Sequence, residues 1–156
     1  MNKKHILLFI CTVVLDQLTK ILISTNMNLY ESIPVIDGFF SITYAQNTGA
    51  AWSMLEGKMI FFYLISLIAL VVMGYFYKES HDNKLAQFGI VLMIGGTIGN
   101  FLDRLRLQYV VDFLDFDLFG YDFPIFNLAD SFLCIGVFIL IVTILLEERG
   151  KKNGTI

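Results

Sequence analysis

Four ionisable side chains stand within or beside strongly apolar stretches of the chain, where charge is costly. Asp16 and Lys20 lie four residues apart in one such stretch, while Asp112 and Asp130 lie at the edges of two others. An ionised group inside a membrane helix costs about 2.5–3.5 kcal/mol on insertion scales, so each of the four is a candidate for function. The spacing and order of Asp16 and Lys20 favour an ion pair on one helix face, which we interpret as structural support near the outer interface.

Asp112 and Asp130 are the more specific pair. The third apolar stretch reaches the membrane surface near Asp103 and the fourth begins near Asp130, so both carboxylates are expected at one depth near the outer face. Two partly desolvated carboxylates in contact share a proton. Such a pair can take a proton from water and give another to a carbonyl oxygen, which is peptide hydrolysis without a metal. The spacing leaves two other interpretations open: Asp112 exposed in a loop, and Asp130 as a helix N-terminal carboxylate favoured by the macrodipole.

Composition and hydropathy predict the elements that must position these groups. The chain has 156 residues, of which 56% are hydrophobic and 16% charged, with a mean hydropathy of +0.70. A soluble domain carries roughly 25% charged residues, and apolar runs of about 18 residues or more cross a bilayer as helices. We therefore predict an all-α integral membrane protein, a single membrane domain over residues 1–156. Its four transmembrane helices are expected at about 6–23, 59–77, 85–102 and 124–146.

The distribution of Lys and Arg predicts the orientation of these helices. Seven of the 11 such residues lie in the amino terminus, the 78–84 loop and the carboxyl tail, and four lie on the other side. Because positively charged loops stay inside, both termini are expected in the cytoplasm, with outer loops at 24–57 and 103–123. The first apolar run is interpreted as a retained span rather than a cleaved signal, because no small-x-small site follows it.

The two outer loops are too apolar to be simple tethers. Residues 40–44 alternate in polarity after the Asp37-Gly38 turn signal, which predicts a small extracytoplasmic β element. Between spans three and four, residues 107–126 interleave aromatic and acidic side chains. We interpret this segment as an outer amphipathic loop or helix at the headgroup level.

Several other chemistries are not supported by the sequence. The net charge of −3 argues against a nucleic-acid partner, and Cys11 and Cys134 have neither disulfide-framework nor zinc-site spacing. His5 and His81 are both expected on the inner face, so no outer Ser or Cys has a histidine base. There is no His-Glu-x-x-His motif. We expect no metal and no cofactor.

Other polar residues flank the same outer region. Arg104 is either an interfacial cation or an anchor for a substrate carbonyl or headgroup. Gly95 and Gly99 are expected to permit close helix packing. Three candidates for buried amides are Asn47, Asn100 and Asn127.

Two functions without catalysis compete with a hydrolase. A small proton-coupled transporter would also place carboxylates in helices. It should show polar residues at the bilayer midplane or a broken-helix pair, yet the second span is uniformly apolar and both key acids lie at the edge. A membrane scaffold would not need paired acids at one depth.

Five blocks in order along nearly the whole chain resemble the lipoprotein signal peptidases, also called signal peptidase II, the membrane aspartic proteases of bacteria. The blocks are Asp16-Gln17-Leu18-Thr19-Lys20, Asn47-Thr48-Gly49-Ala50-Ala51-Trp52, Gly99-Asn100-Phe101-Leu102-Asp103-Arg104, Val110-Val111-Asp112-Phe113 and Phe126-Asn127-Leu128-Ala129-Asp130-Ser131.

The resemblance implies an Asp112–Asp130 catalytic dyad in a multi-pass protein of the bacterial cytoplasmic membrane. The family substrate is a diacylglyceryl-modified prolipoprotein, cleaved before its lipidated cysteine at the outer membrane face, and globomycin-type cyclic peptides inhibit the family. The resemblance also implies substrate-binding or dyad-supporting roles for Asn47, Asn100, Arg104 and Asn127. Supporting roles in the architecture are expected for Asp16, Lys20, Gly49 and Asp103.

Overall fold

The computed structural model describes residues 2–49 and 57–152, which contain four long helices. They are α1 (Lys3–Asn26), α2 (Met59–Glu79), α3 (Lys84–Leu107) and α4 (Leu128–Lys152). Each is long and apolar enough to cross a membrane, as the hydropathy of the sequence predicts. Ala50, Ala51 and Trp52, which complete the second sequence block, lie outside the described residues.

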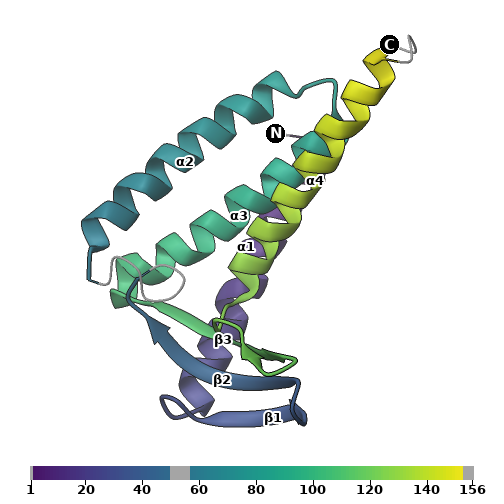
Figure 1. Cartoon of the computed structure of the whole chain (residues 1–156). Helices are drawn as coiled ribbons and strands as arrows, with labels where there is room; N and C mark the ends of the chain where they lie inside the picture. Colours follow the sequence, from purple (N-terminus) through teal and green to yellow (C-terminus); the bar gives the residue numbers. More distant parts are fainter. Residues whose placement is uncertain (1, 50–56, 153–156) are drawn as a thin grey trace.

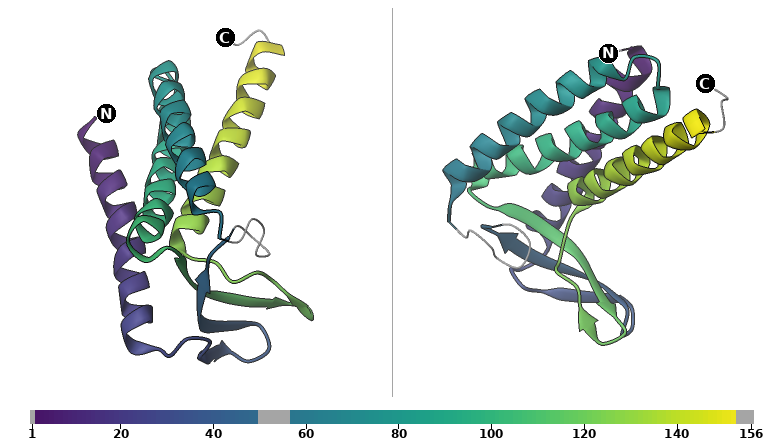
Figure 2. Two further views of the ribbon diagram at one scale, coloured as in Figure 1. Left: turned by 90° about the vertical axis from the view of Figure 1, so that its left-hand side faces the viewer. Right: turned by 45° about the horizontal axis from the view of Figure 1, so that its top comes forward.

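Helix α3 is the centre of the bundle. It packs against α1, α2 and α4, and more than half of its apolar window is buried, whereas the other three helices are mostly exposed. Figure 1 and Figure 2 show these three helices around α3, with both chain termini at the end of the bundle opposite the sheet. The exposed apolar side chains of the outer three helices form the surface that lipid would cover.

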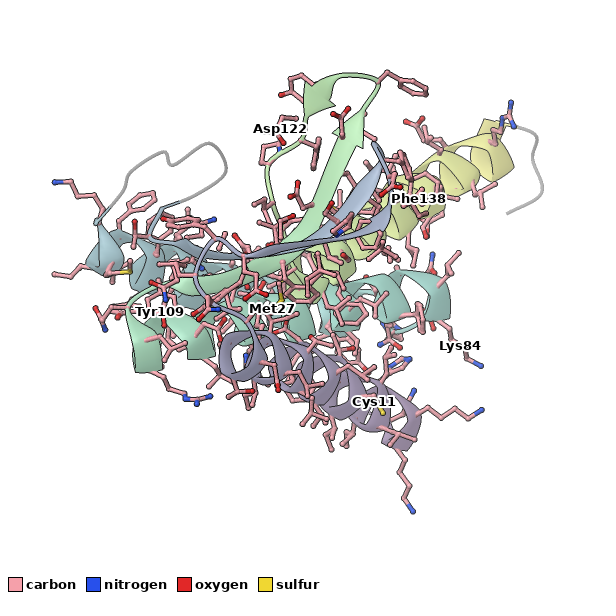
Figure 3. The ribbon with its side chains drawn as sticks, turned by 90° about the horizontal axis from the view of Figure 1, so that it is seen from below. Cys11, Met27, Lys84, Tyr109, Asp122 and Phe138 are labelled. Carbon is pink, nitrogen blue, oxygen red and sulfur yellow. The ribbon has the colours of Figure 1, made fainter. Side chains whose placement is uncertain are left out.

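A small antiparallel sheet crosses the other end of the bundle. Its strand order is β1 (Ser32–Ile36), β2 (Phe40–Asn47), β3 (Val110–Leu118) and β4 (Tyr121–Asp122). The β element predicted from residues 40–44 is therefore confirmed. Figure 3, seen from the sheet end, shows the β3–β4 hairpin around Asp122 reaching away from α1 and its Cys11.

An amphipathic loop or helix is expected between the third and fourth spans, and the helix alternative is wrong. Residues 110–118 and 121–122 are strands that pair with β2 and with each other. Within β3 the run Asp115-Phe116-Asp117 alternates acidic and aromatic residues, which places Phe116 on the opposite face of the sheet from its two acidic neighbours.

Helix bounds also differ from the predicted spans, most relevantly where α4 begins and α3 ends. The fourth helix begins at Leu128 rather than at residue 124, because Phe126 instead pairs with Leu114 of β3 through N–H···O bonds of 2.8 and 3.1 Å. The third helix continues to Leu107, so residues 103–107 are helical rather than part of an outer loop. It ends at Gln108, which has a φ of 66° and donates its N–H to the Arg104 carbonyl.

Small residues on α3 let its neighbours approach closely. A Cβ at Gly95 would lie 2.6 Å from the Thr12 side chain, and one at Gly99 would overlap the Asp16 carboxylate. A Cβ at Gly96 would overlap the carbonyl of Ala129 on α4. The predicted close packing at Gly95 and Gly99 is confirmed, and these glycines fix how near α1 and α4 come to the polar side chains described below.

Candidate active site

Strand β3 carries Asp112 into the protein interior. Alternation along the strand turns Val110 and Asp112 to the same face, and Asp112 is only 2% exposed. Its backbone partner on β2 is Ala45, so Asn47 is the diagonal neighbour across the pair. The Asn47 amide Nδ2 donates to Asp112 Oδ2 at 3.0 Å, while its Oδ1 accepts the Gly49 N–H at 2.9 Å.

The first turn of α4 places Asp130. Asn127 Oδ1 accepts the backbone N–H of Asp130 at 3.0 Å, and Asp130 Oδ2 accepts the backbone N–H of Asn127 at 3.2 Å. This reciprocal arrangement is a capping box with Asn at the N-cap and Asp three residues later. The pairing of Phe126 with β3 brings this cap beside Asp112. The helix N-terminal interpretation of Asp130 is therefore correct, and it is compatible with a chemical role.

Two asparagine amides connect the carboxylates. Asn127 Nδ2 donates to Asp112 Oδ1 at 2.6 Å and to Asn100 Oδ1 at 3.1 Å. Asn100 Nδ2 in turn donates to Asp130 Oδ1 at 2.7 Å. Together with the contacts above, every oxygen of both carboxylates accepts one N–H. The structure thus brings Asp112 and Asp130, 18 positions apart in the sequence, into one hydrogen-bonded group.

A buried charge cluster lies on the α1 side of this group. The Lys20 ammonium contacts Asp16 at 2.9 Å, Asp103 at 3.1 Å and Asn100 Oδ1 at 2.8 Å, and both Asp16 and Lys20 are almost fully buried. The predicted Asp16–Lys20 pair is therefore present, and it is joined by Asp103. Asp103 Oδ2 also accepts the backbone N–H of Val111, which ties α3 to the strand that bears Asp112.

A cavity of about 660 Å³ lies against the two carboxylates, between α2, α3 and α4. Most of its lining is apolar. Its charged and amide-bearing lining residues are Asn47, Asn100, Arg104, Asp112 and Asp130. Cavities of this size, apolar with a few convergent polar groups, are typical of small-molecule and peptide sites.

Arg104 lies on the wall of this cavity, one turn beyond Asn100 on α3. Its guanidinium carbon lies 4.6 Å from the centroid of the Phe62 ring, and its Nη2 donates to the Gly49 carbonyl at 3.1 Å. Its Nε is the one buried side-chain nitrogen or oxygen without a hydrogen-bond partner in the part of the chain that the structure describes. The backbone of Gly49 therefore contacts both Asn47 and Arg104.

Burial sets the protonation of Asp112. Desolvation, and then the nearby Asp130 carboxylate, raise its pKa from 3.8 to about 7, although the hydrogen bonds from Asn47 and Asn127 and the charge of Lys20 oppose the rise. A carboxyl group with this pKa exchanges a proton near neutral pH, as general acid–base catalysis requires.

Four helices able to cross a membrane and two hydrogen-bonded carboxylates on the wall of a cavity define a class, a membrane protein with a buried polar site. The family described as signal peptidase (SPase) II matches residues 8–146. The lipoprotein signal peptidase of Staphylococcus aureus is 45% identical over 159 residues, which cover 98% of each protein. The same identity and coverage are found for that of its strain Newman.

Two solved structures, each described as a bacterial membrane enzyme structure by the in meso method, have the same fold. One has a TM-score of 0.88 at 44% identity and covers 96% of this chain and 90% of that one. The other has a TM-score of 0.84 at 46% identity, with coverage of 91% and 92%. The chain belongs to the signal peptidase II family, and it is therefore a membrane protein of a peptidase family.

The structure assembles all ten residues singled out in the sequence, but two of their neighbours were missed. Gln17 donates to both Asp16, at 3.2 Å, and Asp103, at 2.9 Å, and so completes the charge cluster. Its position next to Asp16 was a usable signal. Phe62, which lies under Arg104, comes from a uniformly apolar helix whose sequence carries no signal of that contact.

Proposed function

We propose that the chain is an aspartic endopeptidase that removes signal peptides from diacylglyceryl-modified prolipoproteins, cleaving before the lipidated cysteine. The observation that carries the proposal is the amide-linked pair of Asp112 and Asp130 on the wall of the cavity. Membership of the signal peptidase II family and the similarity to the lipoprotein signal peptidase of Staphylococcus aureus support it.

In the proposed reaction a water molecule lies between the two carboxyl groups, one ionised and one protonated. The ionised group takes a proton as the water oxygen bonds to the scissile carbonyl carbon, and the protonated group gives its proton to the carbonyl oxygen. As the tetrahedral intermediate collapses, its C–N bond breaks and the leaving nitrogen takes up a proton from the pair. The raised pKa of Asp112 supports the coexistence of both protonation states near neutral pH.

The cavity wall supplies groups to hold the substrate backbone. Arg104 Nε is an unused donor, and its guanidinium is fixed from two sides by Phe62 and the Gly49 carbonyl. We assign Arg104 to a substrate carbonyl, and Asn47, Asn100 and Asn127 to orientation of the dyad. This assignment uses the anchor interpretation of Arg104 rather than that of an interfacial cation.

The apolar part of the cavity suits a lipid-modified substrate that arrives within the bilayer. Its walls include Ile65 and Ala69 of α2 and Leu133 of α4. We place the site near the outer face of the bacterial cytoplasmic membrane, with both termini in the cytoplasm. The clustering of Lys and Arg at the termini and the 78–84 loop, and the location of both termini at the end of the bundle away from the sheet, support this orientation. Globomycin-type cyclic peptides are the expected inhibitors.

The test is cleavage by purified protein in detergent, with EDTA present. Wild type, Asp112→Asn and Asp130→Asn are each incubated with a prolipoprotein carrying its diacylglyceryl group and with the same precursor unlipidated. We expect the wild type to cleave the lipidated precursor only, and each variant to lose activity by at least about 1000-fold, as for loss of a catalytic acid or base.

Asp117→Asn is the matched control, since Asp117 lies on the same strand as Asp112 but is exposed. It should cleave like the wild type. Equal cleavage by a folded Asp112→Asn protein would exclude the dyad. If a folded wild type cleaves neither precursor, the proposed activity is wrong and the transporter and scaffold interpretations return.

A further inference from the structure

The orientation of each amide around the dyad is set by a group that can only donate a hydrogen bond. The Gly49 N–H holds the oxygen of Asn47, and the Asp130 N–H holds the oxygen of Asn127. Asn100 differs from these two, because its oxygen is held by the charged side chain of Lys20 at 2.8 Å, with a longer bond from Asn127 at 3.1 Å. An ammonium has three N–H donors and no acceptor.

The end of the Asn100 amide that faces Asp130, N–H or oxygen, decides in which direction a proton on the dyad can point. Because Lys20 holds the oxygen of Asn100, the amide presents only N–H to Asp130 Oδ1. An N–H cannot accept a proton from a carboxylic acid. If the amide turned over, its oxygen would face Asp130 and would accept the acidic O–H, which would direct the proton away from the cavity.

We propose that Lys20 is a positioning residue for the Asp112–Asp130 pair, one that keeps the N–H of Asn100 toward Asp130 so that the shared proton faces the substrate. This inference rests on the proposed function and extends it. Lys20 acts through Asn100: it is 2% exposed, and of the residues described above as lining the cavity, Asn100 is the one it contacts.

The charge of Lys20 also acts on the dyad. Charged side chains of two helices surround the dyad. They are Asp16 and Lys20 of α1 and Asp103 and Arg104 of α3. The hydroxyl of Tyr63 on α2 also donates to the backbone carbonyl of Arg104. The positive charge of Lys20 lowers the pKa of Asp112, whereas Asp16 carries the opposite charge beside it. Removal of Lys20 should let the pair keep its shared proton to higher pH, and removal of the charge of Asp16 should do the reverse.

The experiment compares Lys20→Met, Lys20→Gln and Asp16→Asn with the wild type, by pH–rate profiles on the lipidated precursor. We expect Lys20→Met to lower kcat by about 10- to 100-fold, the range for losing a group that orients a catalytic side chain. KM should stay within about twofold, because Lys20 does not hold substrate. Lys20→Gln can still donate to Asn100 and should keep more of the kcat.

The pH profiles separate this role from simple support of the fold. The alkaline limb should move up by about one pH unit in both Lys20 variants and down in Asp16→Asn, as expected for loss of one nearby charge of either sign. Asp16→Asn is the matched control, because it breaks the same ion pair from the other side. Should Lys20→Met fail to fold, Lys20→Gln and Asp16→Asn still give the opposite shifts.

The inference would be overturned if the alkaline limb of the pH–rate profile stayed in place in all folded variants and kcat fell only as thermal stability fell. That outcome would leave the proposed peptidase function standing. A wild type that fails to cleave would instead overturn the proposed function, and this inference with it.

Discussion

Asp16 accepts the backbone N–H of Ala129 at 2.9 Å, so a carboxylate of the first transmembrane helix holds the first turn of the last one. Ala129 immediately precedes Asp130. The same Asp16 side chain binds Lys20, which reaches Asn100 and through it the other side of Asp130. The geometry of the dyad therefore depends on how closely α1, α3 and α4 pack.

Close packing at Gly96 should be necessary for activity. In Gly96→Ala the new methyl group would overlap the Ala129 carbonyl, so the first turn of α4 must move. Overpacking of this kind costs about 1–3 kcal/mol, and we expect cleavage to fall by about tenfold or more. Thermal unfolding and cleavage rates test this. Gly74→Ala on α2 is the matched control, because a Cβ there meets nothing within 4 Å, and it should be neutral or slightly stabilising.

Replacement of Asn127 should damage stability and catalysis together. Asn127→Ala removes the N-cap of α4 and both amide contacts between the carboxylates. We expect a loss of about 1 kcal/mol in stability from the cap and a fall in kcat of about 100-fold. Thr143→Ala, which removes a buried side-chain bond from the middle of the same helix, should lower stability without a comparable effect on kcat. Similar kcat values in the two variants would contradict a dyad-orienting role for Asn127.

Stability should depend on pH through Asp112. The folded protein binds the Asp112 proton more tightly than the unfolded chain, because its pKa is about 7 rather than 3.8. The contribution of this group therefore falls as pH rises between these values, by about 1.4 kcal/mol per unit of pKa difference. Relative to Asp112→Asn, the wild type should lose stability from pH 4 to pH 7 in denaturation experiments. If the difference in unfolding free energy between wild type and Asp112→Asn stayed constant from pH 4 to pH 7, Asp112 would not be desolvated.

Arg104 should contribute through the shape of its guanidinium as well as its charge. Lysine cannot lie flat on Phe62, bond the Gly49 carbonyl and offer an Nε donor at the same time. Arg104→Lys should raise KM and lower kcat/KM by about tenfold or more. Arg106→Lys is the control, since Arg106 is exposed and contacts Gln17, and its kinetics should match those of the wild type.

Cys134 offers a direct test of where ligands bind. Cys134 and Cys11 are both exposed free cysteines, but Cys134 lines the cavity, whereas Cys11 lies on α1. A membrane-permeant thiol reagent should modify both, and a globomycin-type cyclic peptide should protect Cys134 alone. Mass spectrometry of the labelled protein gives both readouts in one sample. Protection of Cys11, or of neither thiol, would place the inhibitor elsewhere.

The parts of the fold that could be predicted from the sequence are those with local causes. Hydropathy predicts four helices because a segment that crosses the bilayer must be apolar and must satisfy its backbone hydrogen bonds within itself, whatever its neighbours are. The Asp16–Lys20 pair has the same local character. Hydropathy predicts the start of α4 too early, at residue 124 rather than Leu128, because Pro124 and its neighbours are as apolar as the helix. Their pairing with β3 depends on a strand that hydropathy does not separate from a loop.

The connections within the site could not be predicted from spacing, because they join distant segments. The sequence predicts Asp112 and Asp130 at one depth, but the amides between them come from α3 and from the cap of α4. A reciprocal Asn-x-x-Asp cap is visible in the sequence once such boxes are sought. The contact between Lys20 and Asn100 spans 80 residues and has no local signature.

The central location of α3 also bears on how the protein is made. During synthesis α1 and α2 are made before α3. Lys20 therefore has no contact with Asn100 or Asp103 until some 80 further residues have been translated. Asp16 is one helical turn away and is present from the start, so the nascent helix can neutralise its own charge in lipid. The ion pair that contacts the site in the folded protein thus first lowers the cost of inserting α1 into the membrane.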